Sequence, residues 1–139
     1  MSTKTVAQLF HDKQAKYAAE LGKALGPVEF DNKNNRHVQR FENGVILGHL
    51  NKLKIKKELI CVHGKLFHAW WEKSDAAWLG EPLEDIFKTT NAEGYEILVQ
   101  RFKKGVINCR ADGVNDVQWL SWHDWRAISK PGAKGDTAP

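Results

Sequence analysis

The same string of residues occurs twice in this chain, and it constrains the fold more than any other feature. Gln-Arg-Phe-x-x-Gly-Val-Ile runs from Gln39 to Ile46 and again from Gln100 to Ile107. Internal repeats of this kind are typical of chains built from equivalent structural modules. We therefore expect two copies of one module of about 55 residues.

Two shorter landmarks accompany the string in the same order in both copies. Leu25-Gly26-Pro27 matches Leu79-Gly80-Glu81-Pro82, and Leu9-Phe10-His11 matches Leu66-Phe67-His68. On this alignment the second copy is the longer one, and its additional residues fall around Phe87–Gly94, which reads as a polar loop. The landmarks divide the chain into copies at about 6–62 and 63–128.

A helix is predicted at the start of each copy. In the first copy, Thr3 or Thr5 can act as N-cap and Gly22 can end the helix. Apolar residues recur there at helical spacing, namely Val6, Leu9, Phe10, Tyr17 and Leu21. A shorter helix in the second copy carries Leu66, Phe67, Trp70 and Trp71.

The Gln-Arg-Phe strings predict β-hairpins. Asn43-Gly44 is a strong tight-turn signal between two runs of alternating residues. The expected strands are 36–41, 45–50 and 56–62 in the first copy, and 97–102, 106–110 and 114–120 in the second. The predicted fold class is thus α+β, with two helix–turn–β-meander repeats packed into one small domain, 1–129.

The end of the chain should close this domain. A helical turn over 121–128, with Trp122 and Trp125 three residues apart, would cap the second copy. Residues 130–139 are rich in Gly and Pro and lack apolar anchors, so we expect a disordered tail.

Composition narrows the class of protein. A chain of 139 residues with a net charge of +4 fits one domain. It has no apolar run of about 20 residues and no signal-peptide core. We therefore expect no membrane contact and a cytoplasmic location as encoded. Extracellular occurrence is expected only by non-classical release. Cys61 and Cys109 lie in β-like runs without metal-ligand spacing, and we expect reduced, buried thiols, no metal and no cofactor.

The landmarks together resemble the LGFP-repeat family, whose pattern is Leu-Gly-x-Pro, a spacer, Phe-x-x-Gly-x-Ile and a helix with an aromatic residue. The matching positions are Leu25, Gly26, Phe41, Gly44 and Ile46 in the first copy, and Leu79, Gly80, Pro82, Phe102, Gly105 and Ile107 in the second. The resemblance implies a cell-wall-associated module that binds polysaccharide. Because repeats bury their faces against neighbours, two modules must close on each other or pair in a homodimer.

Tryptophan supplies the candidate contacts for a sugar, since its ring combines a large apolar face with a polar N–H. Adjacent residues cannot share a face, so one of Trp70 and Trp71 should be buried, and Trp71 or Trp122 is the best candidate for exposure. Glu29 and Glu84 follow the two prolines at apparently equivalent places. The predicted ligand-binding residues are Trp71, Trp122, Trp70, Glu84, Asp85 and Glu29.

The leading hypothesis is a non-catalytic, lectin-like module that recognises glycan or cell-wall polysaccharide. Carboxylates that recur once per copy are explained by repetition rather than by glycosidase chemistry, and no nucleophile elbow or triad is recognisable, so we expect no enzyme. An intracellular protein-interaction or scaffold module is the alternative. The lysine stripe Lys52–Lys57 reads as a solvated face, with weak nucleic-acid binding ranked third and a hydrolase fourth.

Overall fold

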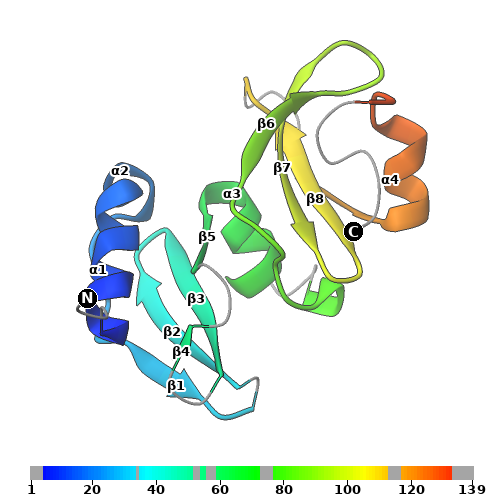
Figure 1. Ribbon diagram of the computed structural model, residues 1–139. Coiled ribbons are helices and arrows are strands. Elements are labelled where there is room, and N and C mark those ends of the chain that lie inside the picture. Colours follow the sequence, from blue (N-terminus) through cyan, green and yellow to red (C-terminus); the bar gives the residue numbers. More distant parts are fainter. Residues whose placement is uncertain are drawn as a thin grey trace. The chain divides into compact units, whose positions relative to one another are not determined.

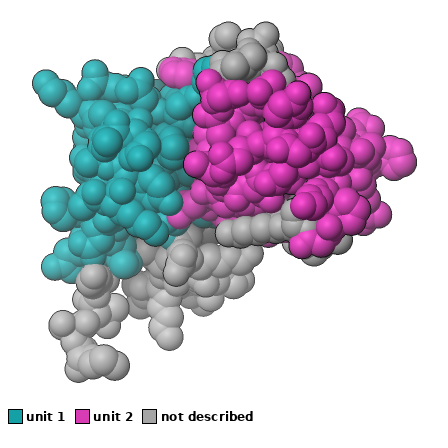
Figure 2. Space-filling model, turned by 90° about the horizontal axis from the view of Figure 1, so that it is seen from above, with its two compact units in different colours: residues 1–67 teal, residues 68–139 magenta. Residues whose placement is uncertain are grey.

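The fold is known from a computed structural model, which describes residues 5–33, 35–51, 54–55, 59–72, 77–112 and 117–132. The chain forms two compact units, Met1–Phe67 and His68–Pro139, which Figure 2 distinguishes by colour. Helices and antiparallel sheets occur in both, which confirms the α+β class. Residues 133–139 of the expected tail lie outside the described residues.

Unit 1 begins with the predicted helix. Helix α1 (Val6–Lys16) starts at a capping box, in which the Thr5 hydroxyl accepts from the backbone N–H of Gln8 and the Gln8 side chain accepts from that of Thr5. A short second helix, α2 (Ala18–Leu21), ends at Gly22 with a φ of 74°. Thr5 is confirmed as cap, and Gly22 ends the helical segment, but the expected single helix is divided at Tyr17 into α1 and α2.

An antiparallel sheet follows in unit 1. Its strands are β1 (Glu29–Asp31), β2 (Arg36–Phe41), β3 (Gly44–Asn51), β4 (Lys54–Ile55) and β5 (Ile60–His63). The order is β1-β2-β3, with both β4 and β5 pairing with β3. Helix α1 lies against this sheet (Figure 1). The core between them contains Phe10, Leu21, Phe41, Ile46, Leu59 and Cys61.

The boundary between the units falls inside one helical segment. Helix α3 (Gly64–Phe67) follows β5 in unit 1, and a π-helical turn, η1 (His68–Glu72), opens unit 2. A 3-10 turn, η2 (Ala77–Leu79), comes next. The sheet of unit 2 then has the order β6 (Phe87–Thr90), β7 (Glu96–Phe102), β8 (Gly105–Arg110) and β9 (Gln118–Ser121).

Helix α4 (Trp122–Ile128) closes unit 2 as expected. Its N-cap is Ser121, whose hydroxyl accepts from the backbone N–H of Asp124 at 3.2 Å. Trp125 is 1% exposed and anchors the helix in the core. The other buried residues of this core are Phe87, Ile97, Val99 and Val106.

The two hairpins share one pattern of strand pairing. Phe41 pairs with Gly44, which pairs with His63; in unit 2, Phe102 pairs with Gly105, which pairs with Ser121. Both hairpins also have a short preceding strand, β1 or β6, that the sequence reading missed. The described residues therefore form five strands in the sheet of unit 1 and four in that of unit 2, rather than three in each, and Phe87–Thr90 is a strand rather than part of a polar loop.

The predicted Leu-Gly correspondence was wrong by four residues. The carbonyl of Leu21 accepts from the turn N–H of Asn43, as the carbonyl of Leu79 accepts from that of Lys104, each at 2.9 Å. Leu21 and Leu79 are both fully buried, whereas Leu25 is 66% exposed. The equivalent pairs are thus Leu21-Gly22 and Leu79-Gly80, and Gly80 has a φ of 81°, close to that of Gly22.

This correspondence also explains why both copies of the Gln-Arg-Phe string contain a glycine. A Cβ at Gly44 would lie 2.6 Å from Leu21 Cδ2, and one at Gly105 would lie 2.6 Å from Leu79 Cδ2. Neither glycine has a positive φ. The glycine is therefore required because the leucine of the Leu-Gly pair and a carbonyl of the neighbouring strand, that of Val62 or Leu120, occupy the space of a side chain, and not because the turn needs its conformational freedom.

Candidate ligand-binding surface

A set of backbone hydrogen bonds fixes the β7–β8 turn of unit 2 to the segment before the sheet. The N–H of Lys103 donates to the carbonyl of Glu81 and that of Lys104 to the carbonyl of Leu79, each at 2.9 Å. Between them, the Gly80 carbonyl accepts from the indole N–H of Trp70 at 3.1 Å. The turn and the Leu79–Glu81 segment consequently form one rigid frame.

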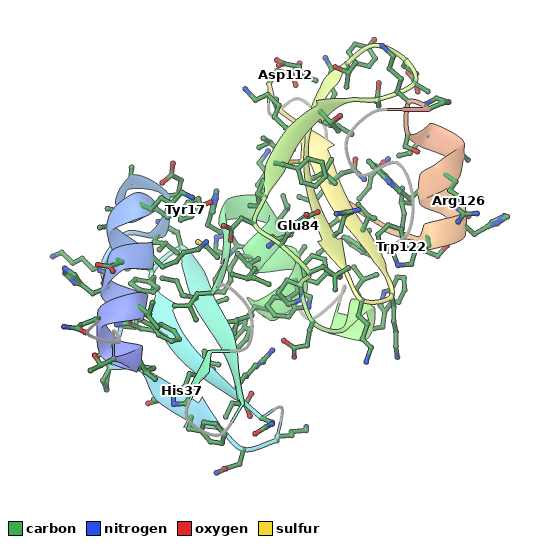
Figure 3. All side chains as sticks on the ribbon, viewed as in Figure 1. Tyr17, His37, Glu84, Asp112, Trp122 and Arg126 are labelled. Carbon is green, nitrogen blue, oxygen red and sulfur yellow. The ribbon has the colours of Figure 1, made fainter. Side chains whose placement is uncertain are left out.

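Two further tryptophans lie at this frame. The indole N–H of Trp122, the first residue of α4, donates to the carbonyl of Lys103 at 3.3 Å. Trp78 directly precedes Leu79 and is 47% exposed. We call Trp78, Lys103, Lys104 and Trp122 the turn surface. Figure 3 shows Trp122 at the start of α4.

Arg101 and Glu84 form an ion pair just behind the turn. Arg101 Nη2 donates to Glu84 Oε2 at 3.0 Å and Nε donates to Oε1, so both carboxylate oxygens are used. The hydrogen bond with Glu84 raises the pKa of Arg101 above its ordinary value. The guanidinium also lies over the ring of Phe87, 6.0 Å from its centroid. This pair holds the start of β6 to β7.

Trp70 has a structural place rather than the predicted contact role. It is 6% exposed, and its ring packs 5.3 Å from that of Phe102 and 5.5 Å from that of Trp71, between centroids. Trp71 is half-buried. The expectation that one of the two would be buried is confirmed, but neither is among the well-exposed aromatic residues.

The acidic residues of the predicted site belong to different units. Glu29 is exposed at the start of β1 in unit 1, opposite Val38. Phe87 occupies the corresponding place in unit 2, opposite Val99, so Glu29 and Glu84 are not equivalent as the two prolines had indicated. Asp85 is half-buried next to Glu84 in unit 2.

Gly26 is the residue that corresponds to Glu84. The side-chain amide of Gln39 donates to the Gly26 carbonyl at 3.1 Å, and that of Gln100 donates to the Glu84 carbonyl at 2.8 Å. Unit 1 makes this contact without any carboxylate. The Glu84 side chain is therefore an addition of unit 2, and its ion pair with Arg101 accounts for it.

Sequence reasoning did not single out Trp78, because its exposure depends on tertiary contacts. With Leu21 and Leu79 in register, the residue before Leu79 is Trp78 and the residue before Leu21 is Glu20. With His63 and Ser121 in register, Trp122 corresponds to Gly64.

The β7–β8 turn of unit 2 also differs in sequence from the β2–β3 turn of unit 1. Lys103-Lys104 of unit 2 stands where unit 1 has Glu42-Asn43, and the Glu42 carboxylate accepts from the backbone N–H of Lys23 at 2.8 Å. Unit 1 thus folds the same turn against the same leucine without a tryptophan or a lysine at these places. Trp78, Lys103 and Lys104 are therefore not needed to form the turn, whereas Trp122 also packs against the hydrophobic core of unit 2.

Unit 1 has one exposed aromatic residue on its sheet. Phe30 is 45% exposed and packs edge-on against His37, with 4.9 Å between ring centroids. Burial lowers the pKa of His37 below its ordinary value. The predicted lysine stripe of this unit, Lys52–Lys57, is described only as the strand Lys54–Ile55, and its side chains lie outside the described residues.

The remaining expectations concern thiols, metals and membranes. Cys61 and Cys109 are both buried, and they form no disulfide. Over the described part of the chain, no three His, Cys, Asp or Glu side chains gather closely enough to hold a metal ion. Within the same residues, no helix has the length and apolar character needed to cross a membrane.

Comparison of the sequence with protein-family models and with curated proteins finds no match to either.

Proposed function

We propose that unit 2 carries a non-catalytic carbohydrate-binding surface that recognises glycan or cell-wall polysaccharide at the turn surface. The carrying observation is the difference between the two units at one turn. Trp78 and Trp122 flank Lys103-Lys104 in unit 2, where unit 1 has Glu20 and Gly64. Large aromatic residues that the turn itself does not require, held beside it with part of each side chain exposed, favour a binding role.

The geometry suits stacking on a sugar ring. The hydrogen bond from Trp122 to Lys103 occupies the indole N–H and fixes the ring, while the side chain stays half-exposed. Trp78 is held through its neighbour Leu79, which is fully buried. Rigid rings lose little conformational entropy on binding, and each offers an apolar face to the C–H groups of a sugar.

The resemblance to the LGFP-repeat family supports the same proposal. Its motif positions in unit 2 include Leu79, Gly80, Phe102 and Gly105, and these residues build the frame on which the turn surface is displayed. Polysaccharide binding, which the resemblance implies, would then use residues next to the motif rather than the motif itself.

Substitution of one exposed tryptophan tests the proposal. Trp78→Ala should lower affinity for a bound glycan about 10-fold, because an exposed stacking residue contributes on the order of 1 to 2 kcal/mol. Affinity is measured by titration calorimetry with ligands found on an array of bacterial wall polysaccharides and common glycans. Tyr95→Ala is the matched control, since Tyr95 is 44% exposed at the other end of β7.

The control should bind as the unchanged protein does. Urea unfolding of each variant separates a loss of binding from a loss of structure. Absence of binding by the unchanged protein across the whole array would overturn the proposal, as would full affinity in a folded Trp78→Ala variant.

A further inference from the structure

The charges around the turn surface indicate which glycans it takes. Resting on the proposed function, we infer that the turn surface binds acidic glycans, whose sugar rings carry carboxylate or phosphate groups. The inference depends on three exposed cationic residues near Trp122: Lys103, whose carbonyl accepts from the Trp122 indole, the adjacent Lys104, and Arg126 on the same helix.

The side chains of these three cations are all exposed. Among the described residues, none of them forms an ion pair with a carboxylate. Three arginines on the strands differ, because Arg36 pairs with Asp31, Arg101 with Glu84 and Arg110 with Asp112. The charges of these three arginines are thus neutralised within the protein, whereas the cations near Trp122 remain available to a ligand.

Their positions follow from the hydrogen bond of Trp122 and from helix geometry. The Trp122 indole contacts the Lys103 carbonyl, which places its ring at the base of the lysine turn. Arg126 is four residues further along α4, and residues four apart lie on the same face of a helix. Figure 3 shows Trp122 and Arg126 on this helix. Asp124, two residues from each, does not share their face.

The corresponding turn of unit 1 carries a negatively charged side chain instead of a positively charged one. Glu42 replaces Lys103 there, and its carboxylate is used within the unit by the N–H of Lys23. The positive turn therefore occurs only together with the two added tryptophans. Stacking and positive charge at one place fit a sugar that presents an apolar face and an anionic substituent, since exposed cations and anions attract over about 10 Å in dilute salt.

Single-stranded nucleic acid combines stacking and negative charge as well, and its binders use an extended basic groove that follows the backbone. The turn surface has two aromatic rings and two cations, and Arg126 adds a third cation at the same end of the sheet of unit 2. This arrangement fits one or two sugar units better than a polynucleotide. The test therefore includes a DNA oligomer as a competing ligand.

Matched ligand pairs that differ only in charge give the sharpest experiment. The probes are oligogalacturonate with its methyl ester, oligomannuronate with its carboxyl-reduced form, phosphomannan with neutral mannan, and a thymidine oligomer. The full chain is titrated with each by calorimetry at low and at moderate salt. The acidic member of at least one pair should bind about 10-fold or more tightly than its neutral partner, and salt should reduce the difference.

The variant Lys103→Gln/Lys104→Gln/Arg126→Gln tests the residues. Each neutralised cation should weaken acidic-glycan binding about three-fold, giving about 30-fold in all, while binding of the neutral partners stays unchanged. Lys33→Gln/Lys88→Gln is the control for net charge, since both lysines are exposed and lie outside the turn surface. It should lose no more than about two-fold.

The outcomes separate the two proposals. Equal binding of acidic and neutral partners, with loss in Trp78→Ala, overturns the charge inference and leaves carbohydrate binding standing. Unchanged acidic-glycan affinity in the triple variant also overturns the inference. Tight binding of the thymidine oligomer without binding of any glycan overturns both proposals.

Discussion

Replacement of Gly105 by alanine tests how the Leu-Gly pair and the Phe-x-x-Gly string fit together. The added Cβ would lie 2.2 Å from the Leu120 carbonyl oxygen and 2.6 Å from Leu79 Cδ2. Ordinary contacts of a Cβ begin at about 3.4 Å. Strand β9 must therefore move by about 1 Å, because the nearest obstacle is its backbone rather than the end of a flexible side chain.

The size of the effect can be worked out from two terms. Overpacking of a filled site costs about 1 to 3 kcal/mol. Displacement of β9 also weakens its hydrogen bonds with β8, and each such bond contributes about 1 kcal/mol. We expect Gly105→Ala to lower the free energy of unfolding by about 2 to 4 kcal/mol, or about 1 to 2 M in the urea midpoint.

Tryptophan fluorescence is a suitable signal because all six tryptophans, from Trp70 to Trp125, belong to unit 2. Circular dichroism follows the whole chain in parallel. Gly26→Ala is the control: a Cβ there meets nothing within 4 Å and φ is not positive, so its midpoint should stay the same or rise slightly. A Gly105→Ala midpoint equal to that of the unchanged protein would refute the steric explanation.

Two further predictions concern single side chains. Trp70→Ala should lower the free energy of unfolding by about 3 to 5 kcal/mol, since it opens a cavity and leaves the Gly80 carbonyl without its donor; a stable variant with reduced glycan affinity, measured by circular dichroism and calorimetry, would instead make Trp70 a contact residue. For His37, the lowered pKa means that the unfolded chain binds the proton more strongly than the folded one, so unit 1 should lose stability as pH falls below about 6.5. His37→Gln should reduce this loss between about pH 7.5 and about pH 5.5, measured by urea midpoints in circular dichroism, and an identical loss in the variant would contradict the assignment.

The parts of the fold that the sequence predicted well are those set by local rules. The segment of α1 and α2 has a capping residue at its start, a stripe of apolar residues and Gly22 at its end, and its outer bounds follow from these, whereas the break at Tyr17 was not predicted. The hairpin of β2 and β3 has alternating residues and an Asn43-Gly44 turn. Strand β1 was missed because it has only three residues, two of them exposed, and is defined by its pairing with β2.

The candidate site was predicted less well, because exposure depends on tertiary contacts. Trp70 and Trp78 look alike in sequence, yet Trp70 fills the space beside Phe102 while Trp78 remains half-exposed. Glu84 was selected because the match between Pro27 and Pro82 made it the equivalent of Glu29. Hydrogen bonds from Gln39 and Gln100 define the correct register, and such bonds are not visible in a sequence that offers two Leu-Gly pairs four residues apart.

That register also separates the residues that fold the module from the residues that can bind. Leu79 fills the space over Gly105 and accepts from the N–H of Lys104, and Leu21 makes both contacts in unit 1. Because the leucine fixes the turn in both units, the residue before it is free to change, and it is Glu20 in one unit and Trp78 in the other. A substitution at either of these positions should therefore change what the surface binds without changing how the unit folds, which is why the Trp78→Ala variant can distinguish binding from stability.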